Sequence, residues 1–222
     1  MGQFDFMVVV DWSGKSTPGP PAHAPGHRKK DNIWIGIAEC RPSGAEVAEH
    51  YHRTRRSAED FLRDNLIEWR ANGKRVLVGF DFCLGYPAGF SELLTGRSGW
   101  ESVYQYLTDK VQDDDRNGNN RFEAAAEINR AMPGEGPFWG MPHRMTVDGL
   151  TARSPWKGKE ELAFGNGRLQ RLRETDRRIK GVQEVWKLYG IGSVGSQSLM
   201  GIPVLYRLRQ AADLKGQVQI WP

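Results

Sequence analysis

The sequence predicts an α/β fold with a mixed β-sheet, and three observations lead to this class. Two short apolar runs, each ending in an aspartate, have the pattern of central strands that are covered on both faces. Two further segments alternate apolar and polar or small residues on either side of a turn, as the strands of an antiparallel meander do. Between this meander and the second apolar run lies a segment with apolar residues at helical spacing.

The first apolar run, residues 6–11, is expected to form the first strand of the sheet. A basic loop without periodicity then leads to two antiparallel strands, at residues 32–40 and 46–51. These two strands are joined by the turn Arg41-Pro42-Ser43-Gly44, which contains the residues that favour a tight reversal.

A helix is expected next, because Ser57 has the chemistry of an N-cap and the apolar side chains after it recur on one face up to Gly73. The second apolar run, residues 75–82, follows this helix. A strand reached through a helix pairs in parallel by a right-handed crossover, so this run should lie parallel to the first strand.

The remaining chain is expected to complete a single domain, residues 1–222, with an insertion over about residues 88–160. The insertion should contain short helices near residues 90–94, 101–112 and 121–130 and then irregular chain rich in Pro, Gly and Trp. After it, we expect partly helical chain at 168–189, a glycine and serine loop at 190–198, an amphipathic helix at 202–212 and a last strand at 217–221.

The charge of the chain permits a polyanionic partner such as nucleic acid without requiring one. The net charge is +4, which is mild. Residues 101–150 contain nine acidic and five basic residues, whereas residues 151–187 contain ten basic and five acidic ones. The basic stretch is explained either by a solvated helix face or by a phosphate-rich ligand.

Nothing in the sequence indicates a membrane or export. The apolar start at residues 6–10 lacks a basic leader and a cleavage site. Cys40 and Cys83 are the only cysteines, and each follows a predicted strand, so a reducing compartment is the simpler interpretation. We therefore expect a cytoplasmic protein with no membrane partner, and the sequence leaves its oligomeric state open.

Asp11 and Asp81 are the strongest candidates for a functional site. Ligands gather at the carboxyl ends of strands in such sheets, and neighbouring strands lie about 4.8 Å apart. Two carboxylates that close repel each other, and a bound divalent cation relieves the repulsion. Mg²⁺ or Mn²⁺ at such a site can ready water for attack on a phosphodiester. The alternative is that each aspartate only caps the turn that follows it.

The two aspartate motifs, VVVDWSG and VGFDFCLGYP, together with the order of strands and helix, resemble the ribonuclease-H-like superfamily. More narrowly, they resemble a family of uncharacterised bacterial proteins described as predicted nucleases. The resemblance implies a ribonuclease-H-like fold in which acids on the first and fourth strands, here Asp11 and Asp81, bind catalytic metal. It covers most of residues 6–82 and parts of 168–222.

The narrower family also tends to carry an arginine followed closely by an acid in a later helix, which Arg173-Glu-Thr-Asp176-Arg-Arg resembles. The resemblance thereby makes Asp176 a third candidate for catalysis and metal binding. Relatives usually continue past the last strand with another acidic motif, whereas this sequence ends at Pro222.

Two segments are candidates for phosphate binding. Residues 11–15 are similar to the first phosphate-binding turn of the actin and sugar-kinase fold, in which Ser13 and Lys15 would meet a phosphate; the alternative is an ordinary hairpin entry. The glycine and serine loop from Gly190 to Gly201 could cradle a phosphate before the following helix, or serve only as a flexible turn. Glu184, nearby, could reach a metal or be a surface acid.

Other chemistry-bearing side chains are better explained by structure. Cys83 is expected to be a buried structural cysteine. His50 and His52 alternate on one strand face without a third ligand at zinc spacing. Tryptophans could stack on bases, but most, like Trp34 and Trp69, fall on positions expected to face the core.

Together these patterns predict a Mg²⁺- or Mn²⁺-dependent hydrolase of phosphodiester bonds, acting on nucleic acid as a nuclease. The phosphate backbone would be held by Arg173, Arg177 and Arg178 with the basic loop around Lys29. Two alternatives stay open. One is a non-catalytic relative of the fold that binds a nucleotide or a partner protein, and the other is a phosphotransfer or cofactor-biosynthesis enzyme on the same scaffold.

Overall fold

The computed structural model describes residues 3–21 and 31–221, which form an α/β protein. The chain divides into two compact units. The first contains the residues up to 81 together with 113–119 and 204–221, and the second contains residues 82–112 and 120–203. Within the described ranges, none of the helices has the length and apolar character needed to cross a membrane.

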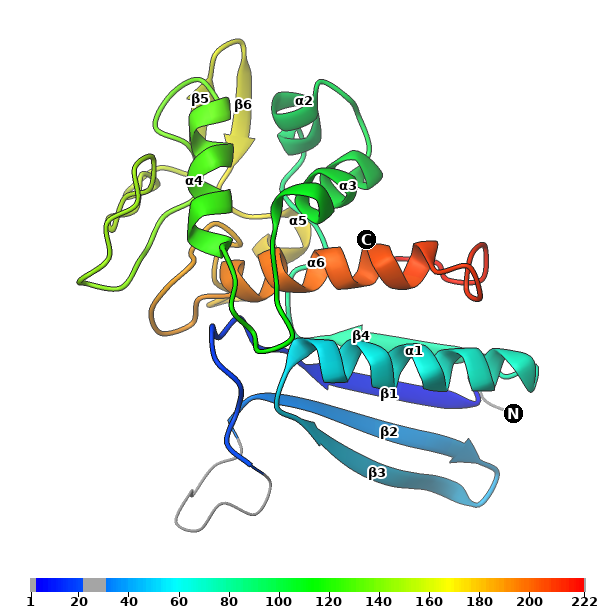
Figure 1. Ribbon diagram of the computed structural model, residues 1–222. Coiled ribbons are helices and arrows are strands. Elements are labelled where there is room, and N and C mark those ends of the chain that lie inside the picture. Colours follow the sequence, from blue (N-terminus) through cyan, green and yellow to red (C-terminus); the bar gives the residue numbers. More distant parts are fainter. Residues whose placement is uncertain (1–2, 22–30, 222) are drawn as a thin grey trace. The chain divides into compact units, whose positions relative to one another are not determined.

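The first unit is built on a four-stranded sheet, drawn in the lower part of Figure 1. Its strands lie in the order β3-β2-β1-β4. The β1–β2 and β2–β3 pairs are antiparallel and the β1–β4 pair is parallel, so the predicted mixed sheet is confirmed. The strand bounds are β1 (Phe6–Asp11), β2 (Ile33–Arg41), β3 (Gly44–His52) and β4 (Val76–Phe80).

Helix α1 (Arg55–Ala71) covers one face of this sheet. Val8 and Val10 of β1 and Ile35 of β2 are buried on this face, and the ring of Phe6 stacks on Trp69 of the helix with centroids 4.5 Å apart. The N-cap is Thr54, not Ser57 as expected from the sequence. Thr54 accepts a hydrogen bond from the Ser57 backbone N–H, so Ser57 is the third helical residue.

The opposite face of the sheet is open to solvent, so the expectation that the two central strands are covered on both faces is wrong. Met7 is 44%, Val9 66%, Leu77 48% and Val47 65% exposed. Alternate strand residues point to opposite faces, and α1 packs on one of them. Val9 is the most exposed because its neighbours in register on both sides, Gly36 and Gly79, have no side chains to shield it.

The second unit is mainly helical with a small hairpin, and its core is aromatic. Trp156 and Trp186 are buried and stack with centroids 5.9 Å apart, and Phe90 and Phe138 pack edge-on against Trp186. The elements are α2 (Phe90–Thr95), α3 (Trp100–Lys110), α4 (Arg121–Ala131), β5 (Glu161–Phe164), β6 (Gly167–Gln170) and α5 (Glu174–Arg177).

The later chain differs from the expectations at four places. The β5–β6 hairpin has no counterpart among them, although Gly165 and the following asparagine form its tight turn. Residues 168–189 contain the end of β6 and the short helix α5 and are otherwise irregular, so the expectation of partly helical chain holds only for α5. Helix α6 (Gly195–Gln210) starts well before residue 202, and the predicted last strand at 217–221 is not formed. Alternation alone does not make a strand without a neighbour to bond, and Trp221 is 87% exposed.

Candidate functional site

The site is the carboxyl edge of the β1–β4 pair, where Asp11 and Asp81 lie side by side. Val10 and Phe80 are partners in the parallel register, so the next residues on the two strands are the two aspartates. The Asp81 backbone N–H donates to the Val10 carbonyl at 3.1 Å, which extends the ladder by one residue. The Trp12 backbone N–H donates to Asp81 Oδ1 at 2.8 Å. These bonds fix Asp81 against the end of β1, next to Asp11.

The two carboxyl groups influence each other directly. Partial burial disfavours the charged carboxylate and raises the pKa of Asp81 to about 6, although the residue remains in contact with solvent. The Trp12 N–H opposes this shift in pKa, while the negative charge of Asp11 and a hydrogen bond between the two carboxyls add to it. Asp81 therefore keeps its proton to a higher pH than an isolated aspartate would.

The bond from Trp12 also gives Asp81 a structural role. The alternative interpretation predicts that each aspartate bonds the backbone of its own turn two residues on. The observed bond instead crosses from one strand to the other, with a sequence separation of 69 residues. Asp81 thus ties the ends of β1 and β4 together and presents a carboxyl beside Asp11 at the same time.

The turn after Asp11 is held in a fixed conformation. Ser13 is buried, and its Oγ accepts a hydrogen bond from the Lys15 backbone N–H at 3.3 Å. The Lys15 ammonium pairs with the Asp31 carboxylate at 2.7 Å and remains half exposed. Ser13 and Lys15 therefore lie in a fixed turn directly after Asp11, and the Lys15 ammonium is half exposed to solvent.

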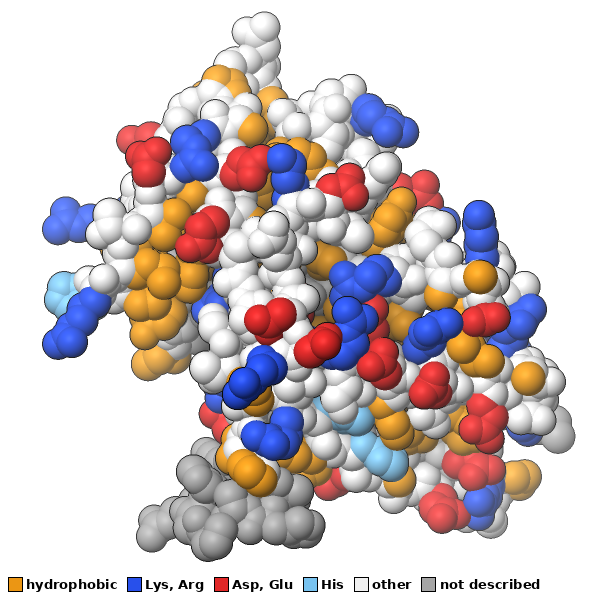
Figure 2. All heavy atoms as spheres, in the orientation of Figure 1, with side chains coloured by type: hydrophobic (Ala, Val, Ile, Leu, Met, Phe, Trp, Pro, Cys, Tyr) orange, Lys and Arg blue, Asp and Glu red, His pale blue; other side chains and the backbone are white. Residues whose placement is uncertain are grey.

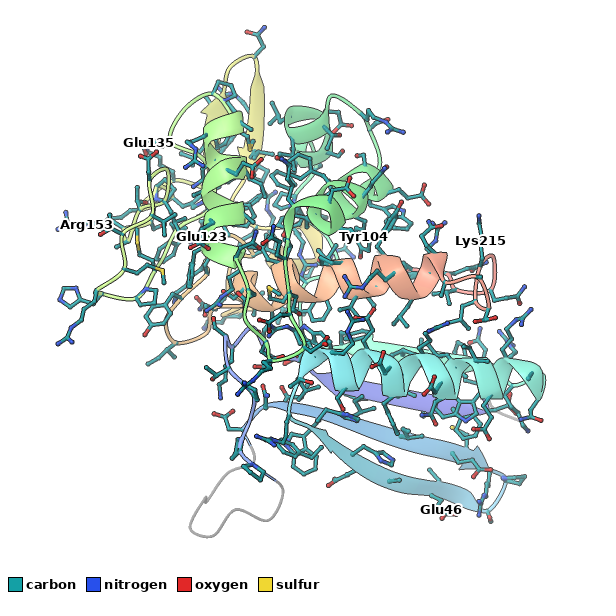
Figure 3. The ribbon with its side chains drawn as sticks, viewed as in Figure 1. Glu46, Tyr104, Glu123, Glu135, Arg153 and Lys215 are labelled. Atoms are coloured by element: carbon teal, nitrogen blue, oxygen red, sulfur yellow. The ribbon has the colours of Figure 1, made fainter. Side chains whose placement is uncertain are left out.

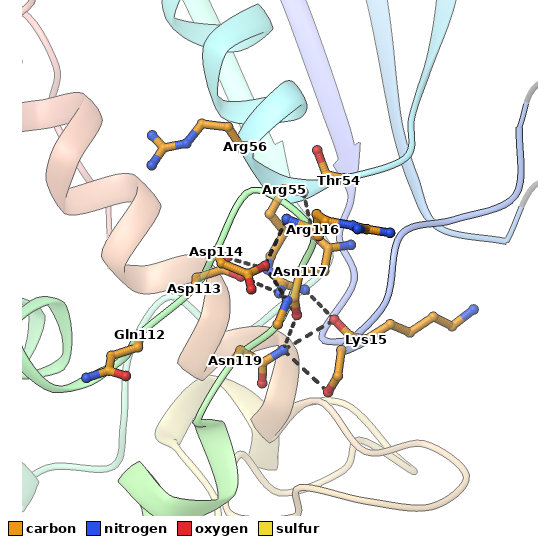
Figure 4. Close-up of polar contacts among 12 residues, drawn as sticks. Lys15, Thr54, Arg55, Arg56, Gln112, Asp113, Asp114, Arg116, Asn117 and Asn119 are labelled. Atoms are coloured by element: carbon orange, nitrogen blue, oxygen red, sulfur yellow. Dashed lines mark hydrogen bonds and ion pairs between the residues drawn. The ribbon is translucent and has the colours of Figure 1, made fainter.

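Arg55, at the start of α1, supports this turn from the protein interior (Figure 4). Its Nη1 donates to the carbonyls of Ser13 and Lys15 at 2.9 and 2.8 Å. Its Nε and Nη2 each donate to an Asp113 carboxylate oxygen at 2.6 Å, and Nη2 also donates to the Asn117 carbonyl at 3.0 Å. Every N–H of this fully buried guanidinium is therefore accepted.

The segment 113–119 that meets Arg55 belongs to the first unit, although the sequence places it inside the expected insertion. Asn117 has a positive φ of 68°, and its Oδ1 accepts the Arg55 backbone N–H at 2.9 Å. The acidic run followed by Asn-Gly indicates a turn. Its partner, Arg55, lies 58 residues earlier and has no sequence signal of its own.

Asp176 lies in the second unit and is engaged by its own helix. It is buried, and its carboxylate accepts hydrogen bonds from the Arg173 side chain at 2.6 and 2.9 Å and from the Arg173 backbone N–H at 3.0 Å. The bond from the Arg173 backbone N–H to the Asp176 carboxylate is the half of a capping box that the acid at N3 supplies at the start of α5. Both predicted residues are thus brought together, in an ion pair that stabilises the helix end.

The other predicted phosphate-binding arginines also have acidic or polar partners. Arg177 donates to Gln170, and both Arg177 and Arg178 lie 3.9 Å from Glu174. On the face seen in Figure 2, basic and acidic side chains are interspersed and do not form a continuous basic stripe. The arginines of the basic stretch that were predicted to hold phosphate therefore each have an acidic neighbour in the structure. The expected basic loop around Lys29 lies outside the described residues.

The glycine and serine loop is explained by packing in the second unit. A Cβ on Gly195 would lie 2.5 Å from the Val185 carbonyl oxygen, and one on Gly201 would lie 2.2 Å from the Phe82 ring. Glu184 is buried and accepts a hydrogen bond from Trp139 Nε1. Burial is also the main reason that its pKa is raised. These residues have structural partners that account for their identity.

Cys83 and the strand histidines have the structural roles predicted for them. Burial raises the pKa of the Cys83 thiol to about 11, so it stays protonated and is a poor nucleophile. His50 and His52 pack against the Phe61 ring beneath α1, with centroids 4.6 and 4.9 Å away. The prediction for Trp34 is wrong, because it stands opposite Asp11 in the β1–β2 register, on the open face.

The oxygen donors at the site fit Mg²⁺ or Mn²⁺ in kind. Within the described ranges, no group of three or more His, Cys, Asp or Glu side chains is arranged to hold a metal. A Mg²⁺ site can be built on one or two carboxylates, with waters and substrate phosphates completing the coordination. Asp11 and Asp81 meet that smaller requirement.

Comparisons with known proteins give no match: no protein-family model, no curated protein and no solved structure is similar to this chain at a significant level.

Proposed function

We propose that this protein is a divalent-cation-dependent hydrolase of phosphodiester bonds, with Mg²⁺ or Mn²⁺ held by Asp11 and Asp81 and nucleic acid as the substrate class. The observation that carries the proposal is the contact between the two carboxyls at the ends of adjacent parallel strands. The fold holds two groups of like charge together, and a cation bound between them would relieve their electrostatic repulsion.

Each residue has a defined part in this proposal. When bound, the cation readies a water molecule for in-line attack and stabilises the charge that develops on the phosphate. Asp11 and Asp81 would hold it through carboxylate oxygens, and Asp81 is kept in place by the Trp12 N–H. The exposed Lys15 ammonium, two residues after the buried Ser13, would attract the phosphate. Arg55 would position this turn through the Ser13 and Lys15 carbonyls.

Calorimetric titration with Mn²⁺ tests the site, and hydrolysis of single-stranded, duplex and hybrid substrates tests the activity. The variants Asp11→Asn and Asp81→Asn remove charge while keeping oxygen acceptors, so the fold should persist. Each should abolish Mn²⁺ binding and hydrolysis. The matched control is Asp60→Asn, an exposed aspartate on α1, which should change neither.

Equal Mn²⁺ binding and equal hydrolysis in wild type and in both variants would overturn the proposal. ATP binding that needs neither aspartate nor metal would instead favour a non-catalytic nucleotide-binding role.

A further inference from the structure

A shallow groove runs across the open face of the sheet and ends at the candidate site. It has a volume of about 300 Å³ and is lined by Val9, Asp11, Trp34, Gly36 and Glu49. All five residues belong to the first unit. The groove therefore joins Asp11, one member of the aspartate pair, to a surface that none of the described helices of this unit covers.

The register of the strands gives the groove its shape. Asp11 is paired with Trp34, so a carboxylate and an indole stand side by side at one end. Glu49 is paired with Gly36, and Gly36 with Val9, so the next row consists of a carboxylate, a position without a side chain, and the apolar side chain of Val9. Glycine inside a strand often marks a place where a ligand approaches the backbone closely.

Gly36 is not required by packing. A Cβ at this position would meet no atom closer than the Val9 carbonyl oxygen at 3.9 Å, which is an ordinary contact. A side chain would therefore fit the strand, and strands prefer residues larger than glycine. The absence of a side chain at Gly36 leaves the floor of the groove free.

We propose that this groove binds a guanine base of the substrate, with the ring against Trp34 over Gly36 and its N–H groups donating to Glu49. The inference rests on the proposed function, since the phosphate of the same nucleotide would then reach the cation at Asp11 and Asp81. It names a guanine nucleotide as the unit that the site recognises.

Three features favour a base. An indole can stack on a base, and the absence of a side chain at Gly36 leaves room for the base beside the Trp34 ring. A carboxylate only accepts hydrogen bonds, and guanine presents two N–H groups side by side that match its two oxygens. Glu49 lies two strands and two residues from Asp11, about 12 Å away on the diagonal across the sheet. One nucleotide spans that distance between its base edge and its phosphate.

An organic cation is the competing ligand, because the charged residues lining the groove are acidic. The two carboxylates lie at separate ends, however, and the floor between them is Val9 and Gly36. The methylene chain of a polyamine could also cover that floor, but a polyamine has no ring to place against the Trp34 indole, whereas a base has one.

Binding of guanosine without metal, and of 5′-GMP with Mn²⁺, can be measured by calorimetry on the full chain. We expect GMP to bind more tightly than AMP, CMP or UMP. Gly36→Val should abolish binding of both guanine ligands without lowering stability. The matched control is Gly79→Val, which lies beside Val9 on the other side, outside the groove, with the same 3.9 Å clearance.

Two further variants test the contacts. Trp34→Ala should weaken guanosine binding by roughly tenfold, the loss expected for a stacked base. Glu49→Gln should remove the preference for guanine. Its control, Glu46→Gln, changes an acid on the same strand near the hairpin turn (Figure 3), where it pairs with Arg41 at 2.7 Å.

The outcomes separate this inference from the proposed function. Mn²⁺ binding that depends on the aspartates, together with nucleotide binding that ignores Gly36→Val, would overturn the groove assignment alone. Guanosine binding that is lost in Gly36→Val, without any Mn²⁺ binding, would support the groove and overturn the metal site. Spermidine binding lost in Gly36→Val, with no binding of guanosine or GMP, would also overturn the inference.

Discussion

Two aspartates of the first unit, Asp113 and Asp81, have opposite surroundings. Asp113 faces the guanidinium of Arg55, and both of its oxygens accept hydrogen bonds at 2.6 Å. Asp81 faces Asp11, a group of the same charge, and its pKa is raised to about 6. The first arrangement is electrostatically complete without a ligand. The second is improved by any cation that enters it, so it is the better candidate for binding.

Arg55 and Asp11 differ in the same way: Arg55 stabilises the fold, whereas Asp11 is positioned by the fold at the candidate site. Arg55 joins the start of α1, the turn at residues 13–15 and the segment 113–119 through five hydrogen bonds. Within the described residues, the Asp11 side chain does not connect separate segments of the chain through a comparable set of hydrogen bonds. Substitutions should therefore reduce stability at Arg55 and function at Asp11.

The largest expected effect is the loss of stability in Arg55→Leu. Removing one partner of a buried ion pair leaves the other charge uncompensated, which typically costs about 3–5 kcal/mol. The free energy of unfolding from urea titration measures this loss. The matched control is Arg56→Ala, whose exposed pair with Asp115 at 3.2 Å should contribute no more than about 1 kcal/mol. Equal losses in the two variants would contradict the contrast between the sites.

Asp176→Asn should cause an intermediate loss of stability. It tests whether Asp176 resembles Asp113, which stabilises the fold, or Asp81, which belongs to the candidate metal site. Its carboxylate accepts three hydrogen bonds from Arg173, and weakening bonds to a charged group costs about 1–3 kcal/mol. We expect this loss of stability with unchanged Mn²⁺ affinity. A variant of normal stability that no longer binds Mn²⁺ would show instead that Asp176 is a metal ligand.

The strands and the aspartate pair could be predicted from the sequence because their signals are local. Each apolar run ends in its aspartate, and a helix between two strands determines that they are parallel. If the two strands are neighbours, their parallel orientation brings Asp11 and Asp81 to the same edge of the sheet, and the observed register shows that they are neighbours.

The open face could not be predicted, because the apolar runs of β1 and β4 look the same whether one face is covered or both are. Trp34 was placed in the core for the same reason, since a tryptophan in a strand does not reveal which face is buried. Arg55 was missed because its partners, Asp113 and Asn117, are distant in sequence and only the folded chain brings them together. The register β1–β2 then assigns Trp34 to the face of Asp11.

The smallest expected effect is the change of stability with pH in Asp81→Asn. The ordinary pKa of an aspartate is about 3.9, and that of Asp81 in the folded protein is raised to about 6. The folded state therefore binds the proton more tightly than the unfolded state. The stability that this carboxyl contributes is fully present below about pH 4 and is lost as the pH rises through about 6.

Asparagine cannot lose a proton in this range, and its Oδ1 can still accept the Trp12 N–H. Asp81→Asn should therefore gain stability relative to wild type between pH 4.5 and pH 7.5, by no more than about 1 kcal/mol, because solvent screens an exposed carboxyl. Urea titrations at the two pH values measure the gain, and Asp60→Asn should show none. Saturating Mn²⁺ should stabilise the wild type alone at pH 7.5, since only the paired carboxylates bind it. A gain that is the same at both pH values, or that is equally large in Asp60→Asn, would contradict the raised pKa of Asp81.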